Sequence, residues 1–446
     1  MGQHFHLSKQ GHSDTTRSYL DTFDWRVFKK DGVLEVAADN SGRWITWRSL
    51  GADQIYGKYP INKIPRFVWD LKVTGFREKL EKILGIRALL PVVHVRSRIH
   101  VFSVLNRQEK TVLRVEIQSD GVPYKSRSGQ HDKRTAMRDK RVHLFPMKGY
   151  ERVVKNACEV LQYKCNLVPV DADPFVTSLM AIRCKPWIDL RKPSILDPEQ
   201  RTDMAAKSIF YHLLKAMKQN EDGMRKDIDS EFLHDFRVAV RRTRSSLDQM
   251  KQVLPSYRIT RFSREFAWLG QVTGPLRDMD VYLLSFDSFR LLLSLEIRDD
   301  LMPLRDFLKR HKIEEHKQLI KALNTERYRK LKRDWEKFLT ESPPKNTTLL
   351  RAKRPVINVA SEKIWRIYRK AIKQGKAIGS DSPATLLHQL RKTCKKLRYL
   401  NEFFHDLFPE DKVRELITSL KILQDNLGEF QDLEVQQISL GNFIQA

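Results

Sequence analysis

The sequence predicts a multidomain protein, with an α+β domain on a largely antiparallel sheet followed by an all-α domain of two tandem helical bundles. Short β-rich runs fill about the first 190 residues, long amphipathic helices fill the rest, and the helical part contains a repeat with an offset of 154 residues. A chain of 446 residues with 41% hydrophobic content is long enough to form two or three domains with buried cores. We expect domains at residues 1–190 and 197–446, the second divided into units at 197–342 and 353–446.

The N-terminal region shows a hairpin followed by further strands. Residues 32–36 and 43–48 are rich in β-branched and aromatic residues, and they flank the polar turn Asp39-Asn40-Ser41-Gly42. Further strands are predicted at 93–104, 111–118 and 141–147, with a helix at 76–84. This order predicts an α+β region with a largely antiparallel sheet.

Beyond residue 197 the apolar periodicity is that of helices. Pro186 and Pro193 indicate a linker before them, and Pro343-Pro344-Lys345-Asn346 interrupts them. Helices are predicted at 202–219, 232–253, 259–273, 279–295, 301–323, 327–339, 358–373, 383–407 and 412–427. Short connections between such helices favour antiparallel bundles.

The repeat is defined by charge. His234 is followed at +3, +7, +8 and +10 by Arg237, Arg241, Arg242 and Arg244, and His388 is followed at the same spacings by Arg391, Lys395, Lys396 and Arg398. The offset (388 − 234 = 154) also relates Gly274 to Gly428 and Asp278 to Asp432. Upstream, residues 215–219 match 370–374 with an offset of 155, which suggests a one-residue slip in a loop.

These cations point to an anionic ligand. On a helix, positions 0, +3, +7 and +10 fall on one side, so each unit has a basic ridge about 15 Å long. Like charges at such spacing repel each other, and arginine suits phosphate oxygens. A single basic stripe is usually a solvated helix face, but two copies in register favour a ligand. The histidines could instead cap helices or lie in the core, and the two aspartates could anchor arginines or cap helices.

Composition limits the partners and the compartment. The net charge of +27 attracts nucleic acid, anionic membranes or polyphosphate, and charge alone does not choose among them. Neither a CxxC pair nor an apolar run of membrane-spanning length occurs, and the first 20 residues do not resemble a signal peptide. We therefore expect a cytoplasmic protein without a membrane span, a zinc knuckle or a redox pair, and its oligomeric state stays open.

The duplicated His-x-x-Arg pattern, with its Gly-x-x-x-Asp segment, resembles the CHAD family, the conserved-histidine α-helical domain. The resemblance covers about residues 197–446. It implies binding of inorganic polyphosphate on a basic surface between the two bundles. The residues that would bind it are His234, Arg237, Arg241, Arg242, Arg244, His388, Arg391, Lys395, Lys396 and Arg398, with Lys215, Arg366, Arg369, Lys370 and Lys373 as weaker candidates. The chain continues less far after Asp432 than after its counterpart, so we expect the closing helix of the second bundle to be short or missing.

The N-terminal region resembles a divergent CYTH domain, a triphosphate-tunnel fold. Residues 19–26 resemble the family's second-strand region, Thr46-Trp47-Arg48 its basic strand, and Arg114-Val115-Glu116 a later acidic strand. Catalytic members begin with Glu-x-Glu-x-Lys, whose carboxylates hold a divalent metal. Here residues 4–8 read His-Phe-His-Leu-Ser, and Glu35 stands where a phosphate-binding arginine is expected. We predict no catalytic and no metal-binding residues, although Arg96, Arg98 and Arg114 could line a tunnel.

The favoured function is therefore non-catalytic binding of polyphosphate, with association with polyphosphate granules and no cofactor. One alternative is a metal-dependent inorganic triphosphatase, which would need magnesium or manganese at carboxylates such as Glu116. A second alternative is a nucleic-acid-binding protein. It is less favoured because the two ridges lack interleaved aromatic residues for base stacking.

Overall fold

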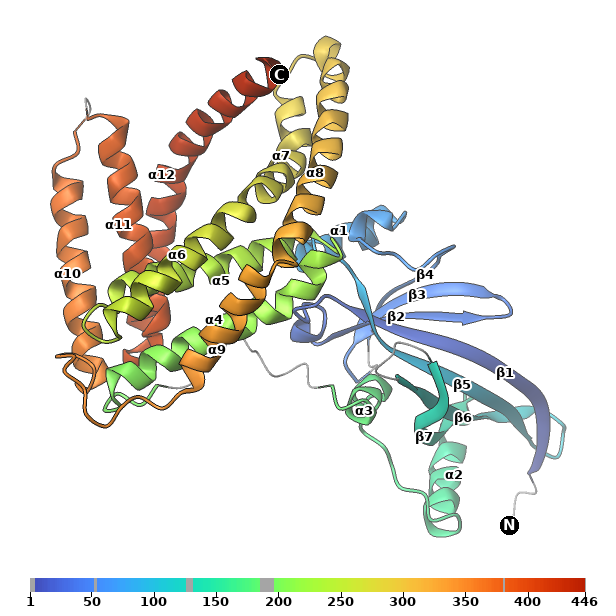
Figure 1. The fold of residues 1–446 in the computed structure, drawn as a ribbon. Coiled ribbons are helices and arrows are strands. Elements are labelled where there is room, and N and C mark those ends of the chain that lie inside the picture. Colours follow the sequence, from blue (N-terminus) through green and yellow to red (C-terminus); the bar gives the residue numbers. More distant parts are fainter. Residues whose placement is uncertain (1–4, 52–53, 126–130, 185–195, 380–381, 446) are drawn as a thin grey trace. The chain divides into compact units, whose positions relative to one another are not determined.

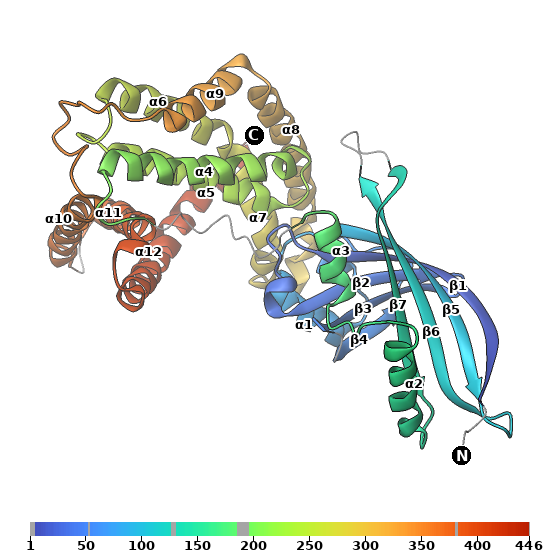
Figure 2. The ribbon, with the colours of Figure 1, turned by 90° about the horizontal axis from the view of Figure 1, so that it is seen from below.

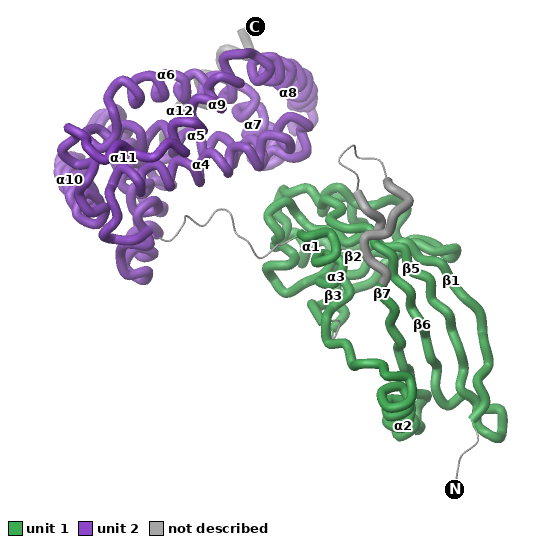
Figure 3. Tube along the Cα trace, turned by 60° about the horizontal axis from the view of Figure 1, so that its bottom comes forward, with its two compact units in different colours: residues 1–189 green, residues 190–446 purple. Residues whose placement is uncertain are grey.

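In the computed structural model the chain divides into two compact units, residues 1–189 and 190–446, which are coloured separately in Figure 3. The structure describes residues 5–51, 54–125, 131–184, 196–379 and 382–445. The predicted linker around Pro186 and Pro193 lies outside these residues. Figure 1 labels the elements of both units, and each unit is described by itself.

The first unit is built on one antiparallel sheet, as predicted. Its strands follow the order β4-β3-β2-β1-β5-β6-β7, and every neighbouring pair is antiparallel. The predicted hairpin is confirmed, because Asp39 pairs with Gly42 across a two-residue turn. Such a sheet is consistent with a tunnel-like fold. The strands are β1 (His6–Asp21), β2 (Gly32–Asp39), β3 (Gly42–Ser49), β4 (Ile55–Pro60), β5 (Leu90–Leu105), β6 (Thr111–Lys125) and β7 (His131–Pro146).

Strand β1 differs from the sequence-based interpretation. Residues 19–21, which resemble a second-strand region, form the end of this first strand, which pairs with β2 on one side and β5 on the other. Its N-terminal half is polar and mostly exposed, so no apolar alternation indicated a strand there. Its buried end, from Ser18 to Asp21, sits between the two neighbouring strands.

Helices cover the sheet on two sides. Helix α1 (Thr74–Leu84) packs Phe76, Leu80 and Leu84 with Leu20 and Leu34 of the sheet. Helix α3 (Pro174–Ala181) packs Phe175 and Leu179 against Tyr19, Val93 and Val95. Because Tyr19 and Leu20 are adjacent in one strand, these two cores lie on opposite faces. Figure 2 shows α3 and the longer α2 (Glu151–Tyr163) with the sheet.

The second unit is helical, as predicted. Its helices are α4 (Thr202–Arg225), α5 (Ser230–Gln249), α6 (Ser256–Val272), α7 (Gly274–Leu291), α8 (Met302–Leu323), α9 (Glu326–Thr340), α10 (Val356–Lys376), α11 (Ala384–Phe403) and α12 (Glu410–Gln445). A tight aromatic core joins α4, α6 and α9, in which fully buried Trp335 contacts Phe210, Phe262 and Phe266. No helix in the described part of the chain is long and apolar enough to cross a membrane.

The sequence repeat is a repeat of helices. Helices α4, α5 and α6 begin 154 residues before α10, α11 and α12 (356 − 202, 384 − 230 and 410 − 256). This constant offset leaves no need for the one-residue slip inferred around Lys215.

We expected the closing helix of the second bundle to be short or missing. This expectation is wrong for the helical segment that corresponds to α7. Helix α12 continues to Gln445, the counterpart of the last residue of α7. In the first helical bundle Gly274-Pro275 begins α7 as a helix separate from α6. In the second bundle Gly428-Glu429 lets the corresponding segment continue as one helix, because only proline removes a backbone donor.

Candidate anion-binding groove

The first arginine of each repeated motif is part of the packing of its own bundle. Nη1 of Arg237 donates hydrogen bonds to the carbonyl of Gly270 (2.9 Å) and to the hydroxyl of Thr273 (2.8 Å), at the end of α6. A Cβ atom on Gly274 would lie 3.7 Å from Nη1 of Arg237, and one on Gly428 would lie 2.8 Å from Nη2 of Arg391. The duplicated arginine and glycine are therefore neighbours in both bundles, and the close fit explains why they recur together.

Two duplicated ion pairs join α5 to α11. Arg242 contacts Glu402 at 2.5 Å, and Lys396 contacts Asp248 at 3.5 Å. Residues 242 and 396 are 154 apart, as are 248 and 402, so the two contacts are equivalent by the repeat. Arg398 also approaches Glu402, at 3.4 Å. Arg242 and, in part, Lys396 thus help to hold the two bundles together, whereas Arg398 shares Glu402 within α11.

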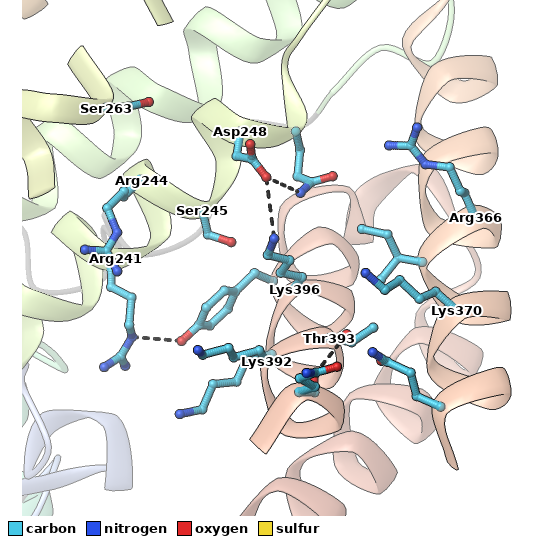
Figure 4. Close-up of a pocket in the computed structure, with 16 residues that line it drawn as sticks. Arg241, Arg244, Ser245, Asp248, Ser263, Arg366, Lys370, Lys392, Thr393 and Lys396 are labelled. Atoms are coloured by element: carbon cyan, nitrogen blue, oxygen red, sulfur yellow. Dashed lines mark hydrogen bonds and ion pairs between the residues drawn. The ribbon is translucent and has the colours of Figure 1, made fainter. Parts of the chain in front are cut away.

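A groove lies between α5, α10 and α11, with a volume of about 870 Å³. Figure 4 shows cationic side chains from all three helices directed into it. Among the described residues, its lining comprises seven cations and one carboxylate, together with smaller polar and apolar groups. The cations are Arg241, Arg244, Arg366, Lys370, Lys392, Lys395 and Lys396, the carboxylate is Asp248, and the others are Ser245, Gln249, Ser263, Ile367, Gln374, Gln389, Thr393 and Tyr399.

Tyr399 and Lys392 were missed from the sequence. The hydroxyl of Tyr399 accepts a hydrogen bond of 2.9 Å from Nε of Arg241, which orients that guanidinium across the contact between the bundles. Lys392 is exposed and lines the groove, but its counterpart in the first helical bundle is Val238. The duplicated pattern therefore could not indicate it. A lysine one helical turn from both His388 and Lys396 was the available signal.

Several predicted binding residues lie away from the groove lining. His234 and His388 are half-buried, and Nδ1 of His388 is buried without a hydrogen-bond partner among the described residues. Lys215 lies over the ring of Tyr211 on α4, and Arg369 lies over Trp365 on α10. The remaining predicted residues outside the lining are Arg237, Arg242, Lys373, Arg391 and Arg398.

Lys363 lies buried on α10, and its ammonium group donates a hydrogen bond to the carbonyl of Gln249, at the end of α5. Burial, with help from the nearby charges of Arg351 and Arg366, lowers the pKa of Lys363 to about 8 from its usual 10.5. The unfolded chain therefore holds this proton more tightly than the folded chain. Consequently the free energy of unfolding gains from this residue as pH rises from about 8 to 10.5, by up to about 3 kcal/mol.

We expect Lys363→Met to remove this gain. Urea unfolding of wild type and variant at pH 7.5 and pH 10 measures it, with Lys376→Met on the exposed face of the same helix as the control. Relative to Lys363→Met, wild type should be more stable at pH 10 than at pH 7.5. An unchanged difference at the two pH values would contradict the buried, weakly basic amine.

Two of the three arginines expected to line a tunnel in the first unit are paired with carboxylates. The register places Arg114 opposite Ser103, so it lies on the other face of the sheet from Arg96 and Arg98. Arg98 pairs with Asp14 at 2.7 Å, and Arg114 pairs with Glu116 at 2.8 Å. The three arginines therefore do not line one tunnel.

Carboxylates of the first unit are also bonded to neighbouring side chains. Buried Arg48 contacts Asp173 at 2.6 Å and Glu35 at 3.8 Å, and Asp120 accepts hydrogen bonds from Gln118. Within the described residues no group of three or more His, Cys, Asp or Glu side chains is placed to hold a metal ion. The magnesium or manganese required by the triphosphatase alternative thus does not fit the carboxylates seen here.

The fold and the groove define a class of protein: a tandem helical domain whose two repeated bundles meet at a cationic groove. The family model of the CHAD domain matches residues 208–441, more than half of the chain, so this chain belongs to the CHAD domain family. None of the curated proteins compared with the chain matches it.

Two solved structures are similar to part of the chain. The CHAD domain from the plant Ricinus communis has 25% identity and a TM-score of 0.49, with 57% of this chain and 83% of that chain covered. PptA from Streptomyces chartreusis has 12% identity and a TM-score of 0.38, with 52% of this chain and 99% of that chain covered.

Proposed function

We propose that this protein binds inorganic polyphosphate in the groove between its two helical bundles and that it does so without catalysis. The observation that carries the proposal is the lining: seven cations face one carboxylate among the described residues, and that carboxylate is already paired with a lysine. Such a set would repel itself when empty, and an anion that offsets the repulsion would bind with charge-assisted hydrogen bonds.

The shape and chemistry of the groove favour a chain of phosphates. A volume of about 870 Å³ has room for several phosphate groups, since one water molecule takes up only about 30 Å³ of liquid. Among the described lining residues the aromatic one is Tyr399, whose hydroxyl is bonded to Arg241, so the groove offers little surface for stacking bases. Membership of the CHAD family supports the same ligand, and association with polyphosphate granules would follow from it.

Isothermal titration of the full chain with polyphosphate of about 60 phosphates tests the proposal. We expect saturable binding that weakens as salt is raised, because phosphate contacts release counterions. Phosphate release from tripolyphosphate with magnesium or manganese tests the alternative. Turnover that is abolished by Glu116→Gln would replace this proposal with a metal-dependent triphosphatase.

Asp248 should weaken the binding that its neighbours provide. Burial alone would raise the pKa of Asp248, but the ion pairs with Lys251 and Lys396 prevail and lower it, so the carboxylate is charged at neutral pH. A unit charge about 6 Å from a phosphate costs about 0.7 kcal/mol in water. We therefore expect Asp248→Asn to raise the affinity for polyphosphate by about threefold.

Glu402→Gln is the matched control for Asp248→Asn, because residue 402 is the repeat counterpart and lies outside the groove lining. It leaves Arg242 and Arg398 without their shared partner, so it should lower stability and should not raise affinity. Equal gains in affinity from both changes would point to a general effect of net charge.

A further inference from the structure

A second surface lies on the solvent-facing side of α10, away from the groove. At 100° per residue, the groove residues 366, 367, 370 and 374 fall on one side of this helix together with buried Lys363. Residues 365, 368, 369, 372 and 376 fall on the opposite side, and we call these five the outer stripe. The two sets are centred about 160° apart. The outer stripe is therefore a separate surface, with its own chemistry.

The outer stripe combines exposed aromatic rings with cations. Trp365 is 57% exposed, Tyr368 is 37% exposed and Ile372 is 43% exposed. The rings of Trp365 and Tyr368 are stacked, with centroids 5.6 Å apart and planes inclined by 22°, and the guanidinium of Arg369 lies 5.9 Å from the Trp365 ring. A tryptophan and a tyrosine this exposed on one helix face are unusual for a surface with no ligand.

The cations of the outer stripe have no carboxylate partner among the described residues. Arg369 and Lys376 are exposed, and neither forms an ion pair there. The acidic residue of α10, Glu362, is occupied by Arg351 and Arg354 near the start of the helix. The surface therefore attracts an anion along its length while offering flat rings for stacking.

We propose that the outer stripe binds single-stranded nucleic acid, with bases stacked on Trp365 and Tyr368 and phosphates held by Arg369 and Lys376. Rings beside cations are the combination that such strands require, because every base has a stacking face and every linkage carries a charge. Inorganic polyphosphate has no bases, so it gains nothing from the rings. The proposal thus concerns a different ligand from the groove and does not rest on the proposed function.

Fluorescence anisotropy of a labelled 20-nucleotide single-stranded RNA of mixed sequence tests the proposal. We expect the Trp365→Ala/Tyr368→Ala variant of the full chain to bind the RNA at least tenfold more weakly than wild type. Its circular dichroism at 222 nm and its urea unfolding should equal those of wild type, which shows that the variant is folded, and its affinity for polyphosphate should change less than twofold. Tyr257→Ala is the control, because Tyr257 is 68% exposed and has Arg258 against its ring, yet lies on α6.

Three results would overturn the proposal. The first is an RNA affinity that the double variant leaves unchanged. The second is a loss of RNA binding that appears only when the cations of the groove are removed, since RNA would then be using the groove. The third is a sedimentation change from dimer to monomer in the double variant with RNA affinity intact, since the outer stripe would then contact a second copy of the chain.

Discussion

Replacing Arg241, Arg244, Lys392 and Lys395 by alanine together should lower the affinity for polyphosphate at least 100-fold. All four line the groove, and they come from both bundles. A hydrogen bond to a charged group contributes about 1.5–3 kcal/mol, and the loss of four such cations exceeds the roughly 2.7 kcal/mol that a 100-fold change requires, even if half of them contact the ligand. Titration at fixed ionic strength measures the change.

A matched variant controls for net charge. Arg310, Arg329, Lys321 and Lys330 are two arginines and two lysines exposed on α8 and α9, outside the groove lining. Their replacement by alanine removes the same charge from the chain. We expect it to weaken binding by no more than about threefold, as screening limits exposed charges more than about 10 Å from a ligand. Equal losses in the two variants would mean that polyphosphate binds the whole basic surface.

Gly223→Ala should destabilise the helical unit by about 1–2 kcal/mol. Gly223 lies near the end of α4, where α5 begins, and a Cβ atom there would overlap the ring of Phe232. The ring of Phe232 is buried, and so is Phe236 one turn further along α5. The Phe232 ring therefore has little freedom to move aside. Overpacking of a core typically costs about 1–3 kcal/mol and exceeds the roughly 1 kcal/mol that alanine gains over glycine in a helix.

Gly375→Ala provides the comparison, because no atom lies within 4 Å of a Cβ atom at that position of α10. We expect its unfolding free energy to equal that of wild type or to rise slightly. Urea unfolding followed by circular dichroism at 222 nm measures both variants. If Gly223→Ala were as stable as Gly375→Ala, α4 and α5 could not be packed as closely as the structure has them.

The helical fold was predictable from the sequence because its signals are local. Apolar periodicity located α4 to α11 to within a few residues at most ends, and the 154-residue offset predicted the two bundles. The polar half of β1 gave no such signal, because its side chains are mostly exposed and do not alternate. Helix α2 does show helical periodicity, with Val153, Ala157, Val160 and Leu161 on one side, and was overlooked in the sequence.

The repeated motif predicted that a basic groove exists, but it predicted only some of the residues that line the groove. Arg241, Arg244, Lys395 and Lys396 do line it, whereas Arg237 and Arg242 are used in packing and in a contact between bundles. A helix pattern fixes which side of a helix a residue occupies, but the partner of that side depends on how α10 and α11 pack against α5. That tertiary information is absent from the motif, so Lys392 and Tyr399 could not be placed by it.

Lysine reactivity with and without ligand tests the central claim most directly, since it uses the unaltered full chain. Acetylation of each lysine is followed by mass spectrometry before and after saturation with polyphosphate. A ligand in the groove should lower the reactivity of Lys370, Lys392, Lys395 and Lys396 at least fivefold. The exposed lysines of α8, Lys309, Lys317 and Lys321, should stay within twofold of their original reactivity. Equal protection of both sets, or protection of α8 alone, would contradict a polyphosphate site in this groove.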